Sequence, residues 1–288
     1  MTLILAVLTP LLAQVGPLVS PGAAPPLRGL PEVEQHRPSR RPADQAAAAT
    51  PLPSRLRACL DTAEASPSDA IEDAQDWLKQ VKGAPAAEPY RCLGAAYSRQ
   101  GDWDEAATAF LSARDAAAPE AKLFRAELGG MAGNAQLAAQ QPDQALATLD
   151  TAHGDAEAAA NIKLAGEIAI DRARALVALK RTDEASKALV EARTSTPDNP
   201  LAWLLSATLS RRQGKLAEAQ AQIATAAQLQ PTDPEIGLEA GVIAVLTGHD
   251  EAACKSWQSV IAAAPDSEAA TTARGYIAQL AAPAPGKP

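Results

Sequence analysis

Hydrophobic and small residues recur along this chain with a step of 34 positions. The residues that keep the step are Pro197, Pro231 and Pro265; Ala185, Ala219 and Ala253; and Leu189, Ile223 and Trp257. Gly214 and Gly248 recur in the same register and mark a turn inside each repeat. The pattern therefore predicts a series of helical pairs, each built like the next.

Small and large residues have different roles in such a series. Gly94 and Ala106 allow the two helices of a pair to come close, while Phe110 fills the space against the next pair. Proline is tolerated where one helix has ended and another begins, because its missing N–H donor costs little there. Asn199 and Asp233 stand directly before prolines and can cap the incoming helices.

The repeat resembles the tetratricopeptide repeat, a helix-turn-helix unit of the same length with the pattern W-x2-L-G-x2-Y, then A-x3-F, then P. The sharpest copy is residues 87–120, with its proline displaced by one position to Pro119. Its matching positions are Tyr90, Leu93, Gly94, Tyr97, Ala106 and Phe110. The resemblance implies an all-α protein, folded as a right-handed α-solenoid of stacked helical pairs.

The resemblance divides the chain into units. These are residues 87–120, 126–159, 166–199, 200–233 and 234–267, followed by a closing helix at 268–281. The unit 126–159 departs most from the pattern, and extra residues on either side indicate longer helices there. Residues 54–82 are expected to form an atypical leading pair, so the solenoid spans 54–282 and a tail covers 283–288. The positions expected to be structural are Tyr90, Leu93, Gly94, Tyr97, Ala106, Phe110, Ala185, Pro197, Trp203, Gly214, Ala219, Pro231, Gly248, Ala253, Trp257 and Pro265.

The start of the chain has a different pattern. Residues 2–13 form an apolar run that suits the core of a signal peptide and is too short to span a bilayer. We expect a signal peptide at 1–13, no transmembrane span after its removal, and a disordered leader rich in proline and alanine at 14–53. Against export, no basic residue precedes the run and Pro10 interrupts it. A periplasmic or secreted location is expected, with a cytoplasmic one as the alternative.

Composition and charge narrow the function classes. The net charge of −8 at pH 7 disfavours binding to nucleic acid. His36, His153 and His249 are far apart in the sequence and offer no metal-binding spacing. Neither a serine-nucleophile motif nor a phosphate-binding glycine loop is present in the sequence. We therefore expect no catalytic residue, no metal site and no cofactor.

The cysteines leave two interpretations open. Cys59 and Cys92 fall in the first helices of successive pairs, and Cys254 would remain single. An oxidising compartment permits a disulfide between the first two. However, equivalent points on adjacent helices are usually farther apart than the roughly 7 Å that a disulfide spans between Cα atoms. Buried free thiols are the preferred interpretation.

The resemblance also implies a binding face. In similar proteins the first helices line a concave groove, and the fifth position of each unit points into it. The groove-facing residues expected here are Arg91, Ile170, Arg174, Leu204, Thr208, Arg211, Leu238 and Val242. Among them Ile170, Leu204 and Leu238 form an apolar stripe. It favours an amphipathic helix or extended segment with apolar anchors and some acidic groups to meet Arg174, Arg211 and Arg212. In the alternative, neighbouring helices or the leader cover the stripe.

Together these patterns indicate a non-catalytic adaptor that binds a protein or peptide partner in the assembly or maintenance of a bacterial envelope. A cytosolic regulatory subunit with the same repeats is the first alternative. A cell-wall polymer-binding protein or enzyme is a weaker one, because glycan cleavage needs a convergent acidic pair that the spacing does not reveal. The partner and the oligomeric state do not follow from the sequence.

Overall fold

The computed structural model describes residues 53–281, and this part of the chain is built from α-helices and one 3-10 helix, without strands. The helices are α1 (Ser54–Ala65), α2 (Pro67–Leu78), η1 (Ala84–Ala86), α3 (Ala87–Gln100), α4 (Trp103–Ala116), α5 (Lys122–Ala138), α6 (Pro142–Ala158), α7 (Ile162–Ala178), α8 (Thr182–Ser195), α9 (Pro200–Arg212), α10 (Leu216–Leu229), α11 (Pro234–Leu246), α12 (Asp250–Ala263) and α13 (Glu268–Ala281). The expected signal peptide, the leader up to residue 52 and the tail lie outside the described residues. Within 53–281 no helix has the length and apolarity to cross a membrane.

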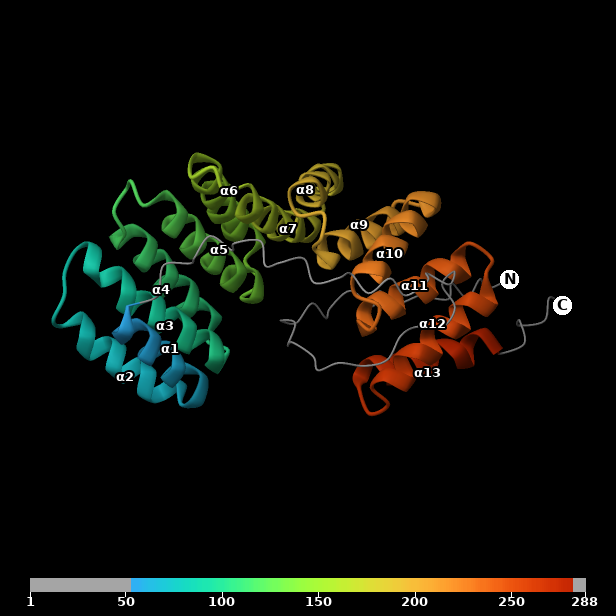
Figure 1. The fold of residues 1–288 in the computed structure, drawn as a ribbon, viewed down its shortest axis with the longest axis horizontal. Helices are drawn as coiled ribbons and strands as arrows, with labels where there is room; N and C mark the ends of the chain where they lie inside the picture. Colours follow the sequence, from blue (N-terminus) through green and yellow to red (C-terminus); the bar gives the residue numbers. More distant parts are fainter. Residues whose placement is uncertain (1–52, 282–288) are drawn as a thin grey trace, which may run out of the picture.

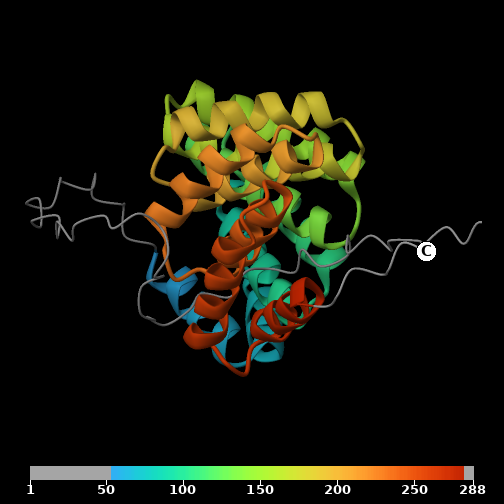
Figure 2. The same ribbon diagram turned by 90° about the vertical axis from the view of Figure 1, so that its right-hand side faces the viewer.

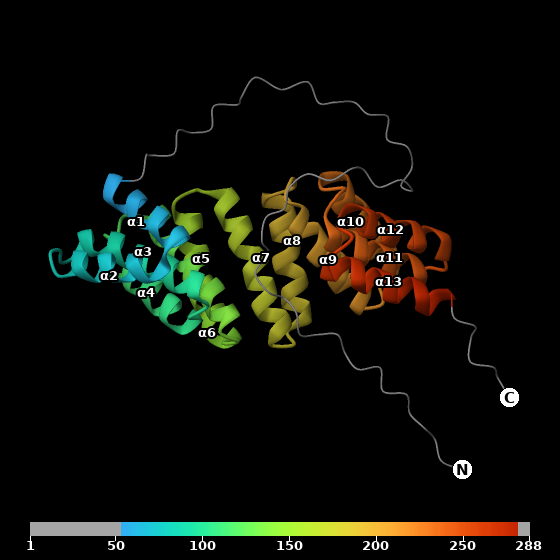
Figure 3. The ribbon, with the colours of Figure 1, turned by 90° about the horizontal axis from the view of Figure 1, so that it is seen from below.

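The helices pair in chain order and the pairs stack into an arch (Figure 1). Figure 2 views the stack from the α13 end, and Figure 3 shows the helices following one another from α1 to α13 along the long axis. First helices of neighbouring pairs pack on one another, as α1 does on α3, α5 on α7, and α11 on both α9 and α13. Second helices of neighbouring pairs do not pack to this extent in the described residues. The first helices therefore line the inner face of an α-solenoid, and the expected all-α class is confirmed.

Local sequence signals account for several helix starts. Asp233 Oδ1 accepts hydrogen bonds from the backbone N–H groups of Glu235 (2.9 Å) and Ile236 (3.1 Å) at the start of α11. Asn199 Oδ1 accepts one from the N–H of Leu201 (3.0 Å) at the start of α9. Both caps precede a proline in the first helical position, as the sequence predicts.

Several turns between consecutive helices contain a residue with positive φ, and the chain supplies two kinds. Gly101, Gly214 and Gly248 have φ between 74° and 84°, a region open to glycine. The helices α5, α6 and α7 have 17 residues each, and the turns after them place Gln140, Ala160 and Lys180 at φ between 53° and 63°. The longer helices expected around 126–159 are present, and α5 and α7 begin at residues 122 and 162, ahead of the expected unit starts at 126 and 166.

Small side chains bring the paired helices together. A β-carbon at Gly94 would lie 2.6 Å from the Phe110 ring, so only glycine fits this crossing of α3 and α4. Trp257 is 3% exposed, and its Nε1 donates a hydrogen bond to the Leu238 carbonyl (3.2 Å). Trp203 is less enclosed, with its Nε1 bonded to the carbonyl of Pro197 (2.9 Å). The repeat alanines at 106, 185, 219 and 253 are fully buried.

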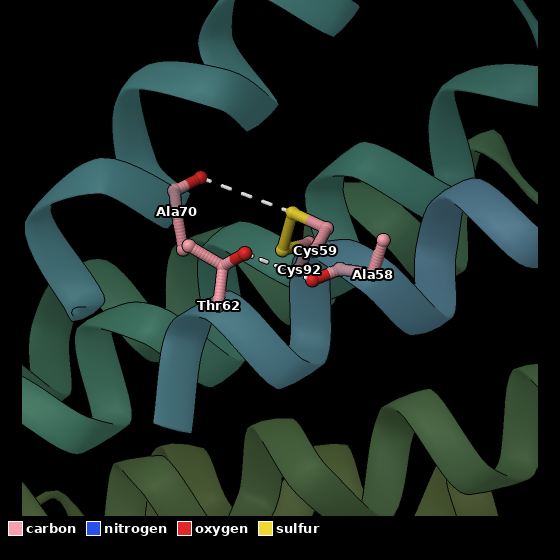
Figure 4. The surroundings of a disulfide bond; sticks show 5 residues. All are labelled: Ala58, Cys59, Thr62, Ala70 and Cys92. Carbon is pink, nitrogen blue, oxygen red and sulfur yellow. Dashed lines mark hydrogen bonds between the residues drawn. A yellow bond between two sulfur atoms is a disulfide. The ribbon is translucent and has the colours of Figure 1, made fainter. Parts of the chain in front are cut away.

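The preferred interpretation of the cysteines is wrong. Cys59 of α1 and Cys92 of α3 form a disulfide, with their Cα atoms 6.1 Å apart (Figure 4). The two helices approach this closely because the core around the bond is made largely of alanines, including Ala63, Ala70 and Ala96. Cys254 is a free, half-buried thiol.

Candidate functional site

The expected groove residues of the C-terminal half lie on α9 and α11, the first helices of their pairs. Leu204, Thr208, Leu238 and Val242 are all half-buried. Leu204 packs against the core between α9, α10 and α11, so part of its side chain is already covered. Leu238 and Val242 pack with Tyr276, Ile277 and Leu280 of α13. The closing helix therefore covers part of the apolar stripe.

Ile170 does not contribute to a groove surface. Its side chain is 3% exposed and packs among Ala169, Ala192 and Ala202. The fifth position of this unit faces the core, where it lies between an alanine of α8 and an alanine of α9. The accessible part of the stripe is therefore the α9 and α11 segment.

The groove arginines are not free. Arg174 Nη1 donates to Asp171 Oδ1 (3.0 Å) on the same helix and to Asn134 Oδ1 (3.2 Å) on α5. Arg211 reaches across to α11, where its Nε and one Nη donate to the two oxygens of Glu239 (2.6 and 3.2 Å). These contacts pair both arginines with carboxylates of the chain itself, whereas Arg212 at the end of α9 is exposed.

The carboxylate in the first of these pairs, Asp171, is half-buried. Burial raises the pKa of the Asp171 carboxyl, while Arg174 and the Asn134 amide favour its ionised form. Asn134 Nδ2 donates to Asp171 Oδ2 at 2.7 Å, which ties α5 to α7 across the inner face. The contacts Asn134–Asp171 and Arg211–Glu239 thus connect neighbouring first helices.

Sequence reasoning missed these carboxylates, although a signal was present. Asp171 and Glu239 each directly follow a fifth-position residue, Ile170 and Leu238. A residue there lies beside the groove position and within reach of the neighbouring first helix. Arg91, the remaining groove candidate, is half-buried, and its guanidinium lies 5.8 Å from the centre of the Phe124 ring on α5.

His153 stands in the only cluster of possible metal ligands within residues 53–281. Its Nε2 lies 2.5 Å from Glu191 Oε1 on α8, and its Nδ1 lies 3.5 Å from Glu157 Oε2 one turn along α6. Arg172 Nη1 is 3.5 Å from the other Glu191 oxygen. Each imidazole nitrogen already faces a carboxylate, so hydrogen bonds and ion pairs account for the cluster, which links α6 to α8.

Comparison with known proteins agrees with this geometry. Residues 170–234 match the tetratricopeptide repeat family model, and none of the curated proteins matches the chain. PilW, a widely conserved type IV pilus biogenesis factor, has a TM-score of 0.62 at 17% identity, covering 76% of this chain and 96% of PilW. PilF of Pseudomonas aeruginosa has a TM-score of 0.58 at 12% identity, covering 77% and 97%. A thermophilic TPR protein from Thermus thermophilus has a TM-score of 0.52 at 19% identity, covering 68% and 98%.

Identities this low establish a common fold and carry no role from one protein to another. The family model covers the chain from α7 to the start of α11, and helical pairs of the same kind continue on both sides of that segment. The 34-residue step, the glycine turns and the solved structures all indicate stacked helical pairs. Residues 170–234 are therefore similar to the tetratricopeptide repeat, and the described chain shares the α-solenoid fold of the solved structures.

Proposed function

We propose that the protein is a non-catalytic scaffold that binds a peptide or helix of a partner protein along the inner face of α9 and α11. The observation that carries this proposal is the half-buried apolar side chains of Leu204, Leu238 and Val242 on neighbouring first helices. The remaining part of each side chain is apolar area that a partner can bury. Arg211 is already paired with Glu239, so apolar anchors dominate recognition there.

We further propose that the scaffold works in the envelope of a bacterium, in an oxidising compartment. The Cys59–Cys92 disulfide supports this, because such bonds persist outside the reducing cytosol. The apolar run at residues 2–13 supports it independently, since it suits a signal peptide. PilW, which shares the fold, is a pilus biogenesis factor, and envelope assembly is therefore the first process to examine.

The test is partner capture from the natural host with tagged wild-type protein and a Leu204→Glu, Leu238→Glu variant. After mild crosslinking, co-purifying proteins are identified by mass spectrometry and the mature amino terminus is read from the same sample. We expect envelope proteins that are lost from the double variant, and a chain that begins at Gln14. A chain that keeps Met1 and captures cytosolic proteins would favour the regulatory-subunit alternative.

The matched control is Val190→Glu, which places the same charge on an exposed apolar site of the outer helix α8. It is expected to keep the partners. Circular dichroism and thermal unfolding must show that the double variant stays folded, and Leu204→Ser, Leu238→Ser is the gentler replacement if it does not. Partners retained by a folded double variant would refute binding at α9 and α11.

A further inference from the structure

A hollow of about 460 Å³ opens where α5 begins, against the end of α6. Leu123, Phe124, Ala158 and Ala159 form its apolar walls, and two acidic residues, Glu120 and Glu127, lie on its lining. Figure 1 shows α5 and α6 in the N-terminal half of the arch, away from α9 and α11. The hollow is thus distinct from the surface proposed above.

The cations around the hollow already have partners. Lys122 Nζ lies 2.8 Å from Asp155 Oδ1 on α6, and Asp155 is 8% exposed. Arg125 donates to the backbone carbonyl of Arg114 (2.6 Å). Arg91 lies against the Phe124 ring, on the wall of the hollow. None of these positive charges is directed at a carboxylate of the lining.

The two carboxylates of the lining, unlike the cations, have no partner in the described residues. Neither Glu120 nor Glu127 makes a side-chain hydrogen bond or ion pair with any residue in 53–281. Glu127 is half-buried and lies in the second turn of α5, too far from the helix start for the helix dipole to explain its charge. The hollow therefore offers two unpaired negative charges beside an apolar wall.

Large apolar side chains in the adjoining segments of the chain are exposed. Leu123 is 43% exposed, and Ile162, three residues after Ala159, is 69% exposed. Exposed apolar area next to unpaired charge is typical of a protein-binding surface rather than of a bare solvated helix end. The partner that complements this hollow presents an apolar side chain next to a positively charged one.

We propose that this hollow docks a segment of a partner protein that presents one large apolar side chain next to a lysine or arginine. The apolar side chain packs on Leu123 and Phe124, and the cation meets Glu120 and Glu127. An acidic segment is disfavoured, because it would add negative charge to carboxylates that have no counter-ion. The proposal does not depend on binding at α9 and α11.

The probe is a short fluorescein-labelled amphipathic peptide of leucine and lysine, titrated by fluorescence anisotropy with the full chain. The matched peptide has glutamate in place of every lysine. We expect the lysine peptide to bind and the glutamate peptide not to bind, with affinity falling as salt is raised. Glu120→Gln, Glu127→Gln should weaken binding about tenfold, because a lost charged hydrogen bond in a partly buried site is worth roughly that factor. Leu123→Ser should weaken binding as well.

Control variants separate the hollow from general attraction to an acidic protein. Glu72→Gln, Glu218→Gln removes the same charge from exposed sites on α2 and α10, and Val190→Ser removes an exposed apolar side chain from α8. Both should bind the lysine peptide as the wild type does, and so should Leu204→Ser, Leu238→Ser. Equal weakening by the control and hollow variants would overturn the proposal, as would wild-type protein that does not bind the peptide. If the wild type is a dimer and Leu123→Ser makes it a monomer, a second copy of the chain fills the hollow. That result would also overturn the proposal.

Discussion

Gln140, Ala160 and Lys180 hold a positive φ without being glycine, and each ends one of the long helices in the middle of the stack. At Ala160 the helix end is closed by a hydrogen bond from the N–H of Asn161 to the carbonyl of Ala156 (3.0 Å). A side chain in the left-handed region costs about 1 kcal/mol or more, because Cβ crowds the following carbonyl. The chain bears this strain at three turns where other repeats use glycine.

Ala160→Gly should therefore stabilise the protein, by up to about 1 kcal/mol after the greater freedom of glycine in the unfolded chain is subtracted. The measurement is urea unfolding followed by circular dichroism. Ala147→Gly is the control, since Ala147 is exposed in the middle of α6 and glycine there should cost roughly 0.5–1 kcal/mol. The same loss of stability in both variants would show that the turn at Ala160 is unstrained.

Glu235, at the start of α11, offers a prediction about pH. Partial burial raises its pKa above the ordinary 4.5, and the nearby carboxylates of Asp233, Glu268 and Glu239 add to the shift. The folded chain therefore keeps this proton to a higher pH than the unfolded chain does. The contribution of Glu235 to stability falls as pH rises from about 4.5 through the raised pKa.

Glu235→Gln should accordingly stabilise the protein at pH 7, by less than about 1 kcal/mol because the group is half-exposed and solvent screens it. The gain should vanish near pH 4, where Glu235 is largely protonated in both the folded and the unfolded wild type. Urea unfolding at the two pH values measures it. Glu218→Gln in the first turn of α10 is the control, and a gain as large in this variant would rule out local repulsion as the cause.

At the scale of the elements, the sequence predicts helix boundaries best where proline, glycine and alanine recur with the 34-residue step. The pairs α9–α10 and α11–α12 follow Pro200, Gly214, Pro234 and Gly248 closely. The end of α5 and the start of α7 are harder to predict, because the turns there use Gln140 and Ala160 in place of glycine. The sequence did not predict the disulfide, because the usual distance between adjacent helices is larger than the distance at which α1 packs on α3.

The same α1–α3 contact carries the next prediction. The disulfide closes a loop with a sequence separation of 33 residues that contains α2. Cys59→Ala, Cys92→Ala should cost roughly 3–4 kcal/mol in the stability of the first two pairs, because the unfolded loop regains its freedom. Thermal unfolding with and without reductant measures this, and Cys254→Ala is the control. An oxidised wild type that unfolds like the reduced one would contradict it.

At the scale of the whole molecule, the binding surface could be predicted only in part. The 34-residue step located the inner face and the half-buried Leu204 and Leu238. It did not reveal the charge balance, since Arg211 finds Glu239 on the next first helix and Arg174 finds Asn134 on the preceding one. Such pairs depend on how neighbouring units stack, and the sequence of a single unit does not reveal this stacking.

The stacking itself leads to the last prediction. Helices in the described residues pack on neighbours or next neighbours in the chain, and the ends of the arch share no core. Trp257→Ala, at a side chain 3% exposed on α12, should cost about 3–5 kcal/mol. Because each pair stabilises only its neighbours, hydrogen exchange should accelerate in α11 to α13 and stay unchanged in α1 to α4. Mass spectrometry resolves the two regions, with Val190→Ala on α8 as the neutral control. A uniform loss of protection along the chain would instead mean that the solenoid unfolds as one cooperative unit, and that a partner bound at either proposed surface stabilises all of it.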